Sequence, residues 1–421
     1  MKTQTFPLLN SRSLDPLINR IGDARLVLLG EASHGTHEYY TWRSAITKRL
    51  IVEKKFNFIA VEGDWPDCYR VNRYIKGFDN QDKSPEFILR SFNRWPTWMW
   101  ANWEMVSLIS WLKVYNSKQS YQNKVGFYGL DVYSLWESME AILEYLKTND
   151  PTTAKMAKKA IDCFTGFEKN EHEYAAHSLT SSCREEVVSL LKEIRIRAAM
   201  YNHDPEAALN STQNAHIMVE AEKYYHNMMA FDERTWNIRD RHMMDTLDRL
   251  IDFYGKNAKG MVWAHNTHIG DARYTDMFKQ GMFNIGQLAR EKYSEKDSVL
   301  VGFGSYSGSV MAGRSWGDLM QEMEVPEALI GSVEQMMHSE FAENRLYLMD
   351  STYVKNDFNR VLPHRAIGVV YYPENEKHNY VPSHFSRRYD AFLFIDQTKA
   401  LHPLHIKTDV GQVPETYPFE F

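Results

Sequence analysis

The chain has 421 residues, of which 43% are hydrophobic and 25% charged, and its formal net charge is −6. This composition is ordinary for a globular protein, so we expect one catalytic unit with a large core rather than a disordered chain. The negative net charge gives no sign of the basic surface that binding to nucleic-acid phosphates requires, and we expect no nucleic-acid partner. The chain has neither eighteen consecutive apolar residues nor an apolar leader, so we expect a cytoplasmic protein with no membrane partner.

Short apolar runs rich in β-branched and aromatic residues predict buried strands along the chain. In chain order these runs are Leu26 to Leu29, Phe58 to Val61, Val125 to Leu130, Met261 to Ala264, Val299 to Phe303, Ile367 to Tyr371 and Ala391 to Ile395. Between Thr36 and Lys54, apolar residues recur every three or four positions, which predicts an amphipathic helix after the first strand. We therefore predict an α/β fold with a central, mostly parallel sheet flanked by helices.

The middle of the chain has a different pattern. From about Leu135 to Phe253 there are long amphipathic stretches, such as Glu185 to Met200 and Asp240 to Tyr254, and almost no strand pattern. We predict a helical subdomain at residues 135–255, inserted between a first part of the α/β core at 1–134 and a second part at 256–421. The sequence carries no signal for an oligomeric state.

The three cysteines, Cys68, Cys163 and Cys183, contain no C-x-x-C pair. Their odd number and their spacing argue against a disulfide framework and against a thiolate zinc site. We expect each of them to be a small buried hydrophobe, as in proteins of a reducing cytoplasm.

Titratable side chains follow four of the predicted strands. These residues are Glu31, Glu62, Asp131 and His265. If the strands are parallel neighbours, the four side chains gather at one edge of the sheet, where open α/β sheets bind their ligands. His268 follows His265 by three residues and is expected in the same region.

The loop after the first strand is the densest part of this candidate site, with Glu31, His34, His37 and Glu38 within eight residues. Gly30 and Gly35 permit a tight backbone turn there. We expect structural roles for His37 and for Glu38, which can occupy the first turn of the helix. The remaining carboxylates and histidines can position a water molecule and deprotonate it, because imidazole titrates near neutral pH.

Other chemistries compete with this interpretation. The same glutamates and histidines can bind zinc or iron, although His172 and His177 are spaced five apart and do not form a metallopeptidase motif. Ser305, Ser307 and Ser309 suggest a serine nucleophile, but the segment lacks the G-x-S-x-G elbow. Trp98 and Trp100 can wall an apolar pocket, with packed core as an equal or better interpretation.

Several segments, in this order along the chain, resemble the erythromycin esterase family. They are Val27 to Glu38, Val61 to Trp65, Trp98 to Asn102, Gly129 to Ser134, Arg239 with Asp240, Ala264 to His268, Tyr306 to Ser309, Arg365 to Val370 and Phe394 to Asp396. The resemblance implies an α/β core with a helical subdomain beside the cleft, and hydrolysis of a macrolactone ester by water without a metal or cofactor. It also implies that His34 is the general base.

The resemblance further assigns supporting roles around His34. It gives catalytic support to Glu31, Arg43, Glu62, His265 and His268, and we expect Asp131, Trp98, Trp100 and Tyr306 to bind the substrate. Arg43 can reach this site only if His34 precedes the helix, because on one helix the two residues would lie on opposite faces.

We hypothesise that His34, oriented by Glu31, takes a proton from a water molecule that attacks the ester carbonyl, while Arg43 or a histidine stabilises the oxyanion. The expected partner is a small-molecule ester or lactone, with macrolide inactivation, and hence antibiotic resistance, as one possibility. Two alternatives stay open: a metal-assisted hydrolase of another substrate, and a non-catalytic protein that binds a haem-like small molecule.

Overall fold

The structure is a computed structural model that describes residues 5–405, except 168–169, 203, 230–232, 352–353 and 355–356. Within these residues, the main sheet has nine strands in the order β1-β8-β11-β6-β2-β5-β3-β4, and β7 pairs with β6. A separate two-stranded sheet consists of β9 and β10. The strands are β1 Thr5–Pro7, β2 Leu26–Leu29, β3 Phe58–Val61, β4 Gly126–Gly129, β5 Gly260–Trp263, β6 Ser298–Ala312, β7 Gln321–Val325, β8 Arg345–Leu348, β9 Val361–Arg365, β10 Tyr380–His384 and β11 Ala391–Thr398.

The central strands run parallel to one another. Parallel ladders join β11 to β6, β6 to β2, β2 to β5, β5 to β3 and β3 to β4, whereas β1, β7 and β8 pair antiparallel. The prediction of a mostly parallel sheet is therefore confirmed. Because β2, β5, β3 and β4 are adjacent and parallel, their carboxyl ends meet at one edge.

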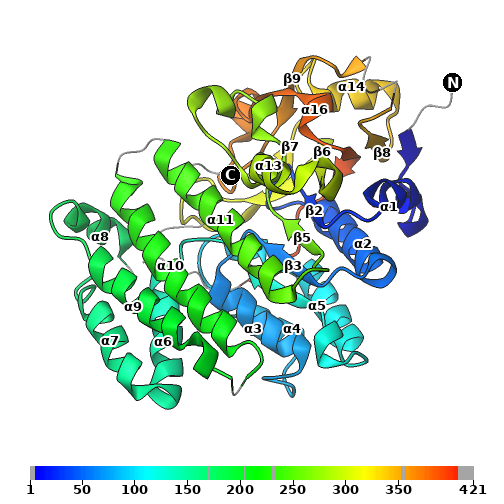
Figure 1. The fold of residues 1–421 in the computed structure, drawn as a ribbon. Coiled ribbons are helices and arrows are strands. Elements are labelled where there is room, and N and C mark those ends of the chain that lie inside the picture. The colour runs from blue at the N-terminus through cyan, green and yellow to red at the C-terminus, as the bar shows by residue number, and fades with distance from the viewer. Residues whose placement is uncertain are drawn as a thin grey trace.

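Helices cover both faces of this sheet (Figure 1). They are α1 Asp15–Ile21, α2 His37–Lys54, α3 Trp65–Lys76, α4 Pro85–Leu89, α5 Trp103–Asn116, α6 Leu135–Asn149, α7 Pro151–Asp162, α8 Glu171–Ser178, α9 Arg184–Arg197, α10 Ala207–Met228, α11 Glu233–Tyr254, α12 Asn266–Ile269, α13 Ile285–Asp297, α14 Val333–Glu340 and α16 Phe385–Arg388. Among the helices of the described chain, none has the length and apolar character that crossing a bilayer requires.

Two hydrophobic cores lie on the two faces of the sheet, because successive residues of a strand point to opposite sides. In β2, Val27 and Leu29 belong to the core that includes apolar residues of α1, α2 and α5. Leu26 and Leu28 belong to the core that includes apolar residues of α6, α10, α11 and α13. The side chains of all four strand residues are completely buried. This two-sided burial is why β2 reads in the sequence as an unbroken apolar run.

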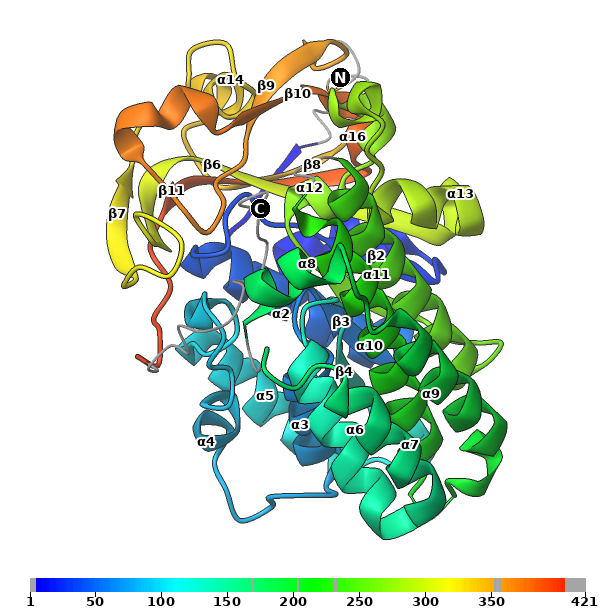
Figure 2. The same cartoon turned by 90° about the vertical axis from the view of Figure 1, so that its left-hand side faces the viewer.

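The chain between β4 and β5 contains the helices α6 to α11. Helix α10 packs against α6, α8, α9 and α11. Figures 1 and 2 show α7 and α9 at one side of the molecule, with α14 and β9 on the opposite side. The helical character predicted for this part of the chain is present, whereas its status as a subdomain with bounds 135–255 stays a prediction.

One predicted strand is absent. Residues Ile367 to Tyr371 form only isolated bridges, from Ile367 to Ser33 and from Val370 to Gly313. Their apolar side chains are buried all the same, because Ile367, Val369, Val370 and Tyr371 are at most 4% exposed. The prediction was wrong because an apolar run reports burial and does not distinguish a buried irregular segment from a strand.

The expectation that every cysteine is unpaired was also wrong. Cys163, just after α7, and Cys183, just before α9, form a disulfide with Cα atoms 5.8 Å apart. Cys68 is buried and free, as expected. The pair escaped the sequence analysis because the two cysteines are 20 residues apart, and only the packing of the intervening helices brings them together.

Candidate active site

The loop between β2 and α2 packs closely against Asn266 and Met311. A Cβ atom on Gly30 would lie 2.1 Å from Oδ1 of Asn266, and one on Gly35 would lie 1.8 Å from the carbonyl oxygen of Met311. Both distances are shorter than atoms can approach, so these two positions need glycine because of space. Helix α2 begins at His37, so His34 lies in the preceding loop, from which it can share a site with Arg43.

Glu31 joins His34 to Arg43. Nδ1 of His34 donates to Oε1 of Glu31 at 2.9 Å, and Nη2 of Arg43 donates to Oε2 at 2.5 Å. His34 and Arg43 are both 0% exposed. Arg43 also lies over the rings of Tyr40 and Trp263, at 4.4 and 4.6 Å from their centroids. The guanidinium therefore fixes Glu31, and Glu31 fixes the ring of His34.

The second nitrogen of His34 is buried without a hydrogen-bond partner among the described residues. Since Nδ1 carries the proton that it donates to Glu31, Nε2 carries the lone pair in the neutral ring. A buried polar atom with no partner costs free energy, and such atoms in native proteins call for an explanation. In the neutral ring, Nε2 of His34 is thus a hydrogen-bond acceptor without a partner among the described residues.

His265, at the end of β5, lies beside His34 with 5.0 Å between the ring centroids. Its backbone N–H donates to Oε2 of Glu62 at 2.8 Å, and its ring hydrogen-bonds to Thr267 and to the backbone of Ala32. Burial and the neighbouring His34 hold the pKa of His265 well below its usual range. His265 is therefore a neutral ring that packs against His34.

Arg239, on α11, connects two of the strand ends. Its guanidinium donates to both carboxylate oxygens of Asp131, at 3.0 and 2.7 Å, and to Oε1 of Glu62 at 2.7 Å. Although burial opposes the charge, Asp131 and Glu62 hold the pKa of Arg239 well above its usual range. Burial also raises the pKa of Glu62, but the charges of His268 and Arg239 outweigh it and keep that pKa well below its usual range.

His268 lies between two carboxylates, those of Asp240 and Glu62. Its Nδ1 is 2.9 Å from Oδ2 of Asp240, its Nε2 is 3.4 Å from Oε1 of Glu62, and its ring stacks on Trp236 with 4.5 Å between centroids. Burial lowers the pKa of His268, yet Asp240 and Glu62 outweigh burial and raise it to about 9. The two carboxylates thus favour the charged form of His268, whereas Nη1 of Arg239, 3.1 Å from Nε2, opposes it.

This charge makes stability depend on pH. A histidine whose pKa is raised from 6.5 to about 9 on folding adds stability that is complete below pH 6.5 and is lost as the pH rises to 9. We expect the free energy of unfolding to fall by up to roughly 3 kcal/mol across this range. Urea unfolding at several pH values measures the fall, and the variant His268→Gln should show a flatter profile. The same fall in both proteins would contradict the assignment.

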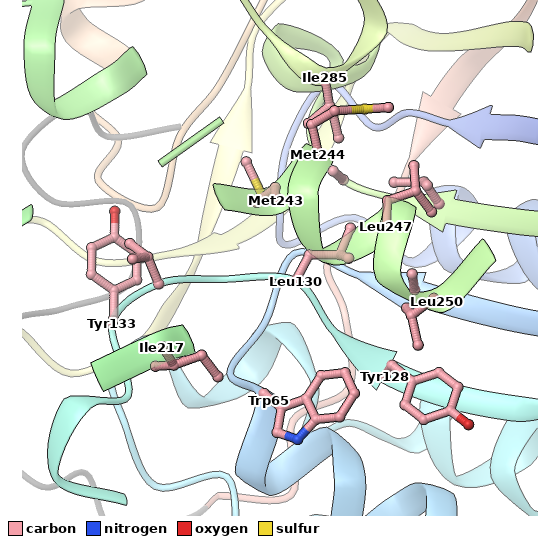
Figure 3. Close-up of a cluster of buried hydrophobic side chains, with 14 of the residues drawn as sticks. Trp65, Tyr128, Leu130, Tyr133, Ile217, Met243, Met244, Leu247, Leu250 and Ile285 are labelled. Carbon is pink, nitrogen blue, oxygen red and sulfur yellow. The ribbon is translucent and has the colours of Figure 1, made fainter. Parts of the chain in front are cut away.

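Helix α11 holds Arg239 and Asp240 in position. Figure 3 shows Met243, Met244, Leu247 and Leu250 of this helix among the buried side chains near Tyr128 of β4 and Leu130, which follows that strand. Two turns of buried apolar side chains thus follow the two charged residues along the helix. Arg239 and Asp240 stood among the family-like segments of the sequence, but no role was predicted for either.

Known proteins share this chain's sequence pattern and fold. The family model described as Erythromycin esterase matches residues 51–398. The chain belongs to the erythromycin esterase family. The matched region contains Glu62, Asp131, Arg239, His265 and His268, whereas the loop with His34 precedes it.

Individual members and solved structures agree with this assignment. Erythromycin esterase type II of Escherichia coli is 24% identical over 357 residues, which cover 77% of this chain and 81% of that protein. A solved succinoglycan biosynthesis protein superposes with a TM-score of 0.77 at 21% identity, over 95% of this chain and 96% of the other. A histidine-to-asparagine mutant of the erythromycin esterase EreC, described as an open conformation, superposes with a TM-score of 0.68 at 16% identity, over 98% and 100%. Both structures share the fold of this chain.

The predicted catalytic residues of this erythromycin esterase family member gather in one buried region. They are Glu31, His34, Arg43, Glu62, His265 and His268, each at most 1% exposed. Ser305 accepts a hydrogen bond from Tyr39, and Ser309 donates one to Glu322. Neither of these contacts pairs a serine with a histidine base, so they give the serine-nucleophile alternative no support.

The predicted substrate-binding residues have structural partners. Both carboxylate oxygens of Asp131 bind Arg239. Trp98 and Trp100 are 1% and 2% exposed, as expected for packed core, and Nε1 of Trp100 donates to the backbone carbonyl of Glu62. The ring of Tyr306 stacks on His338 with 3.6 Å between centroids. The proposed contacts of these four residues with a substrate stay predictions.

Proposed function

We propose that this protein hydrolyses a carboxylic ester or lactone with a water molecule that His34 activates. The observation that carries the proposal is the buried Nε2 of His34, which has no partner among the described residues while Nδ1 is fixed to Glu31. A histidine fixed in this way is the arrangement that general-base catalysis requires. Membership of the erythromycin esterase family supports hydrolysis as the reaction.

The proposed reaction has two steps. Nε2 of His34 takes a proton from water, and the water oxygen bonds to the ester carbonyl carbon to form a tetrahedral oxyanion. The C–O bond to the alcohol then breaks, and the imidazolium of His34 returns its proton to the departing oxygen. Glu31 remains ionised throughout and stabilises the positive ring, as the carboxylate of a catalytic triad does.

Arg43 has a positioning role in this scheme and can also supply the oxyanion donor. Its Nη2 is bound to Glu31, while its Nη1 has no hydrogen-bond partner among the described residues. An N–H donor aimed at the oxygen that becomes charged is a large contribution to catalysis in a site that excludes water. We assign this contribution to Arg43 because both ring nitrogens of His268 are already in contact with Asp240, Glu62 or Arg239.

The pairing of the carboxylates favours water activation over a metal at the His34 site. Glu31 binds Arg43, and Glu62 and Asp131 bind Arg239. A divalent cation at these oxygens would have to take the place of a buried guanidinium. The displaced guanidinium would then remain buried without a negative partner, close to the cation. We therefore propose that the reaction at His34 needs neither a metal nor another cofactor.

The substrate must reach a site that is buried in this structure. Because the six predicted catalytic residues are at most 1% exposed, we propose that part of the chain moves before a substrate contacts His34. The solved EreC mutant is described as an open conformation, which supports such a motion for the shared fold.

The substrate class is tested by a screen. Purified protein is incubated with a set of macrolides and with simple esters and lactones, and products are analysed by mass spectrometry. Opening of a macrolactone adds the mass of one water molecule, and we expect at least one compound to show this change. Hydrolysis of a macrolide would indicate that the protein inactivates antibiotics. Hydrolysis of simple esters or lactones, but of no macrolide, would indicate a different natural substrate. No hydrolysis of any compound, with tight binding of a ligand such as haem, would contradict the proposal in favour of a binding protein.

The role of Glu31 is tested by Glu31→Gln. We expect kcat to fall by about 10²- to 10⁴-fold with a much smaller change in KM, because the neutral amide no longer stabilises the imidazolium of His34. Glu53→Gln is the matched control, since Glu53 is on α2 and pairs with the partly exposed Arg49. Steady-state kinetics of both variants check the result, and a kcat for Glu31→Gln within about twofold of the wild-type value would exclude this role.

A further inference from the structure

A second group of histidine and glutamate side chains shares no member with the six predicted catalytic residues around His34, which we call the His34 cluster. It consists of His37 at the start of α2, Glu104 in the first turn of α5, and His402 in the segment that follows β11. These three residues line a hollow of about 340 Å³. Three segments that are far apart in the sequence thus bring two imidazoles and one carboxylate to a single point.

The three donor atoms are close together. Nδ1 of His37 and Nδ1 of His402 each lie 2.6 Å from Oε1 of Glu104, and one ligand atom from each residue falls within 4.8 Å of the others. The two rings are nearly perpendicular, at 88°. Tetrahedral zinc with ligand bonds of about 2.0–2.2 Å keeps its donors roughly 3.3 Å apart, so an ion needs only a small widening of this group.

We propose that His37, Glu104 and His402 form a binding site for a divalent transition-metal ion such as Zn²⁺. Two imidazole nitrogens and one carboxylate oxygen are a ligand set that zinc accepts, with the fourth position open to water. The side chains of His37 and His402 are 32% and 61% exposed, so an ion can enter from solvent. The side chain of Glu104 is only 4% exposed, and its carboxylate already accepts a hydrogen bond from each histidine.

Charge distinguishes this group from the His34 cluster. Among the described residues, no arginine or lysine forms an ion pair with Glu104. In contrast, Glu31, Glu62 and Asp131 each form an ion pair with an arginine. Lys48 lines the hollow, and the positive ends of α2 and α5 also oppose a cation. We therefore expect binding in the micromolar range rather than the tighter binding of buried structural zinc.

The site would connect the end of the described chain to the catalytic loop. The backbone N–H of His37 donates to the carbonyl of Lys399, and that of Trp103 donates to the carbonyl of His402. A metal ion would add side-chain bonds to this contact, and His37 is only three residues from His34. We expect the ion to hold the segment after β11 more firmly in its contacts with α2 and α5. This effect does not depend on the chemistry at His34.

Zinc titration of the tag-free, full-length, chelator-treated protein tests the proposal. We expect calorimetry to show one saturable Zn²⁺ per chain and thermal unfolding to show a higher Tm with Zn²⁺ but not with Mg²⁺. In His402→Gln, whose amide can still donate to Glu104, we expect affinity to fall at least about tenfold. His378→Gln changes an exposed histidine outside the group and should bind as the wild type does.

Two results would overturn the site: no saturable zinc binding by the wild-type chain, or His402→Gln binding zinc as tightly as His378→Gln does. Glu104→Gln supplies an independent variant, for which the proposal requires the same loss of affinity. Far-UV circular dichroism and the Tm without zinc confirm that each variant is folded before it is titrated. Because the readout is bound zinc, the outcome does not depend on which substrate the protein hydrolyses.

Discussion

The variant His34→Asn should lose turnover by about 10²- to 10⁴-fold or more, the contribution of a positioned general base. Asparagine has no nitrogen that can accept a proton from water, although its amide is small enough for the space that the buried ring occupies. The fall should appear in kcat and in kcat/KM alike, because the ring acts in the transition state. Steady-state kinetics on the substrate found by the screen measure it.

The matched control for this experiment is His177→Asn, which changes an exposed histidine of α8. We expect the control to retain full activity. A folded His34→Asn protein with the turnover of the control would show that another group activates the water.

The variant Arg239→Met should have the largest effect on stability. It leaves the carboxylates of Glu62 and Asp131 buried without the guanidinium that binds both of them. Breaking a buried ion pair by removing one partner costs about 3–5 kcal/mol, because the remaining charge is uncompensated. We expect a loss of this size in the free energy of unfolding, measured with urea at pH 7.

Arg241→Met provides the comparison on the same helix. Arg241 is exposed, two residues further along α11, and its guanidinium lies over the ring of Phe283. An exposed substitution of this kind should change the free energy of unfolding by about 0.5 kcal/mol or less. Equal effects of the two substitutions would mean that Arg239 does not stabilise the buried carboxylates of Glu62 and Asp131.

The parts of the fold that the sequence predicted best are those in which local pattern and burial coincide. Strands β2 and β3 have the predicted bounds, because each is an apolar run buried on both faces. The strands that were not predicted are short or polar: β7 reads Gln-Glu-Met-Glu-Val and is partly exposed, and β9 contains Pro363. Their pairing comes from tertiary contacts, which strand propensity does not report.

The candidate site was predictable where residues follow strands. The order of β2, β5, β3 and β4 brings Glu31, His265, Glu62 and Asp131 to one edge, as the strand ends suggested. Arg239 and Asp240 were missed because charged residues on an amphipathic helix usually face solvent. Their burial follows only from the packing of α11 over the ends of these strands, and a charged pair directly before an apolar stripe was the one available signal.

The cluster of His37, Glu104 and His402 was missed for a similar reason. The sequence analysis expected a structural role for His37, and nothing in the local pattern connects it to residues 67 and 365 positions further along the chain. The three segments meet through tertiary contacts, among them the antiparallel bridges that hold Thr36 beside Ala400 and Asn102 beside Pro403.

Chemical rescue tests whether Nε2 of His34 takes the proton from the attacking water. The variant His34→Gly removes the ring and leaves a space into which free imidazole can bind. We expect hydrolysis by His34→Gly to rise with imidazole concentration until it saturates, whereas the wild-type rate should not change. A rate for the folded variant that stays flat at every imidazole concentration, or that already equals the wild-type rate without imidazole, would contradict this role of His34.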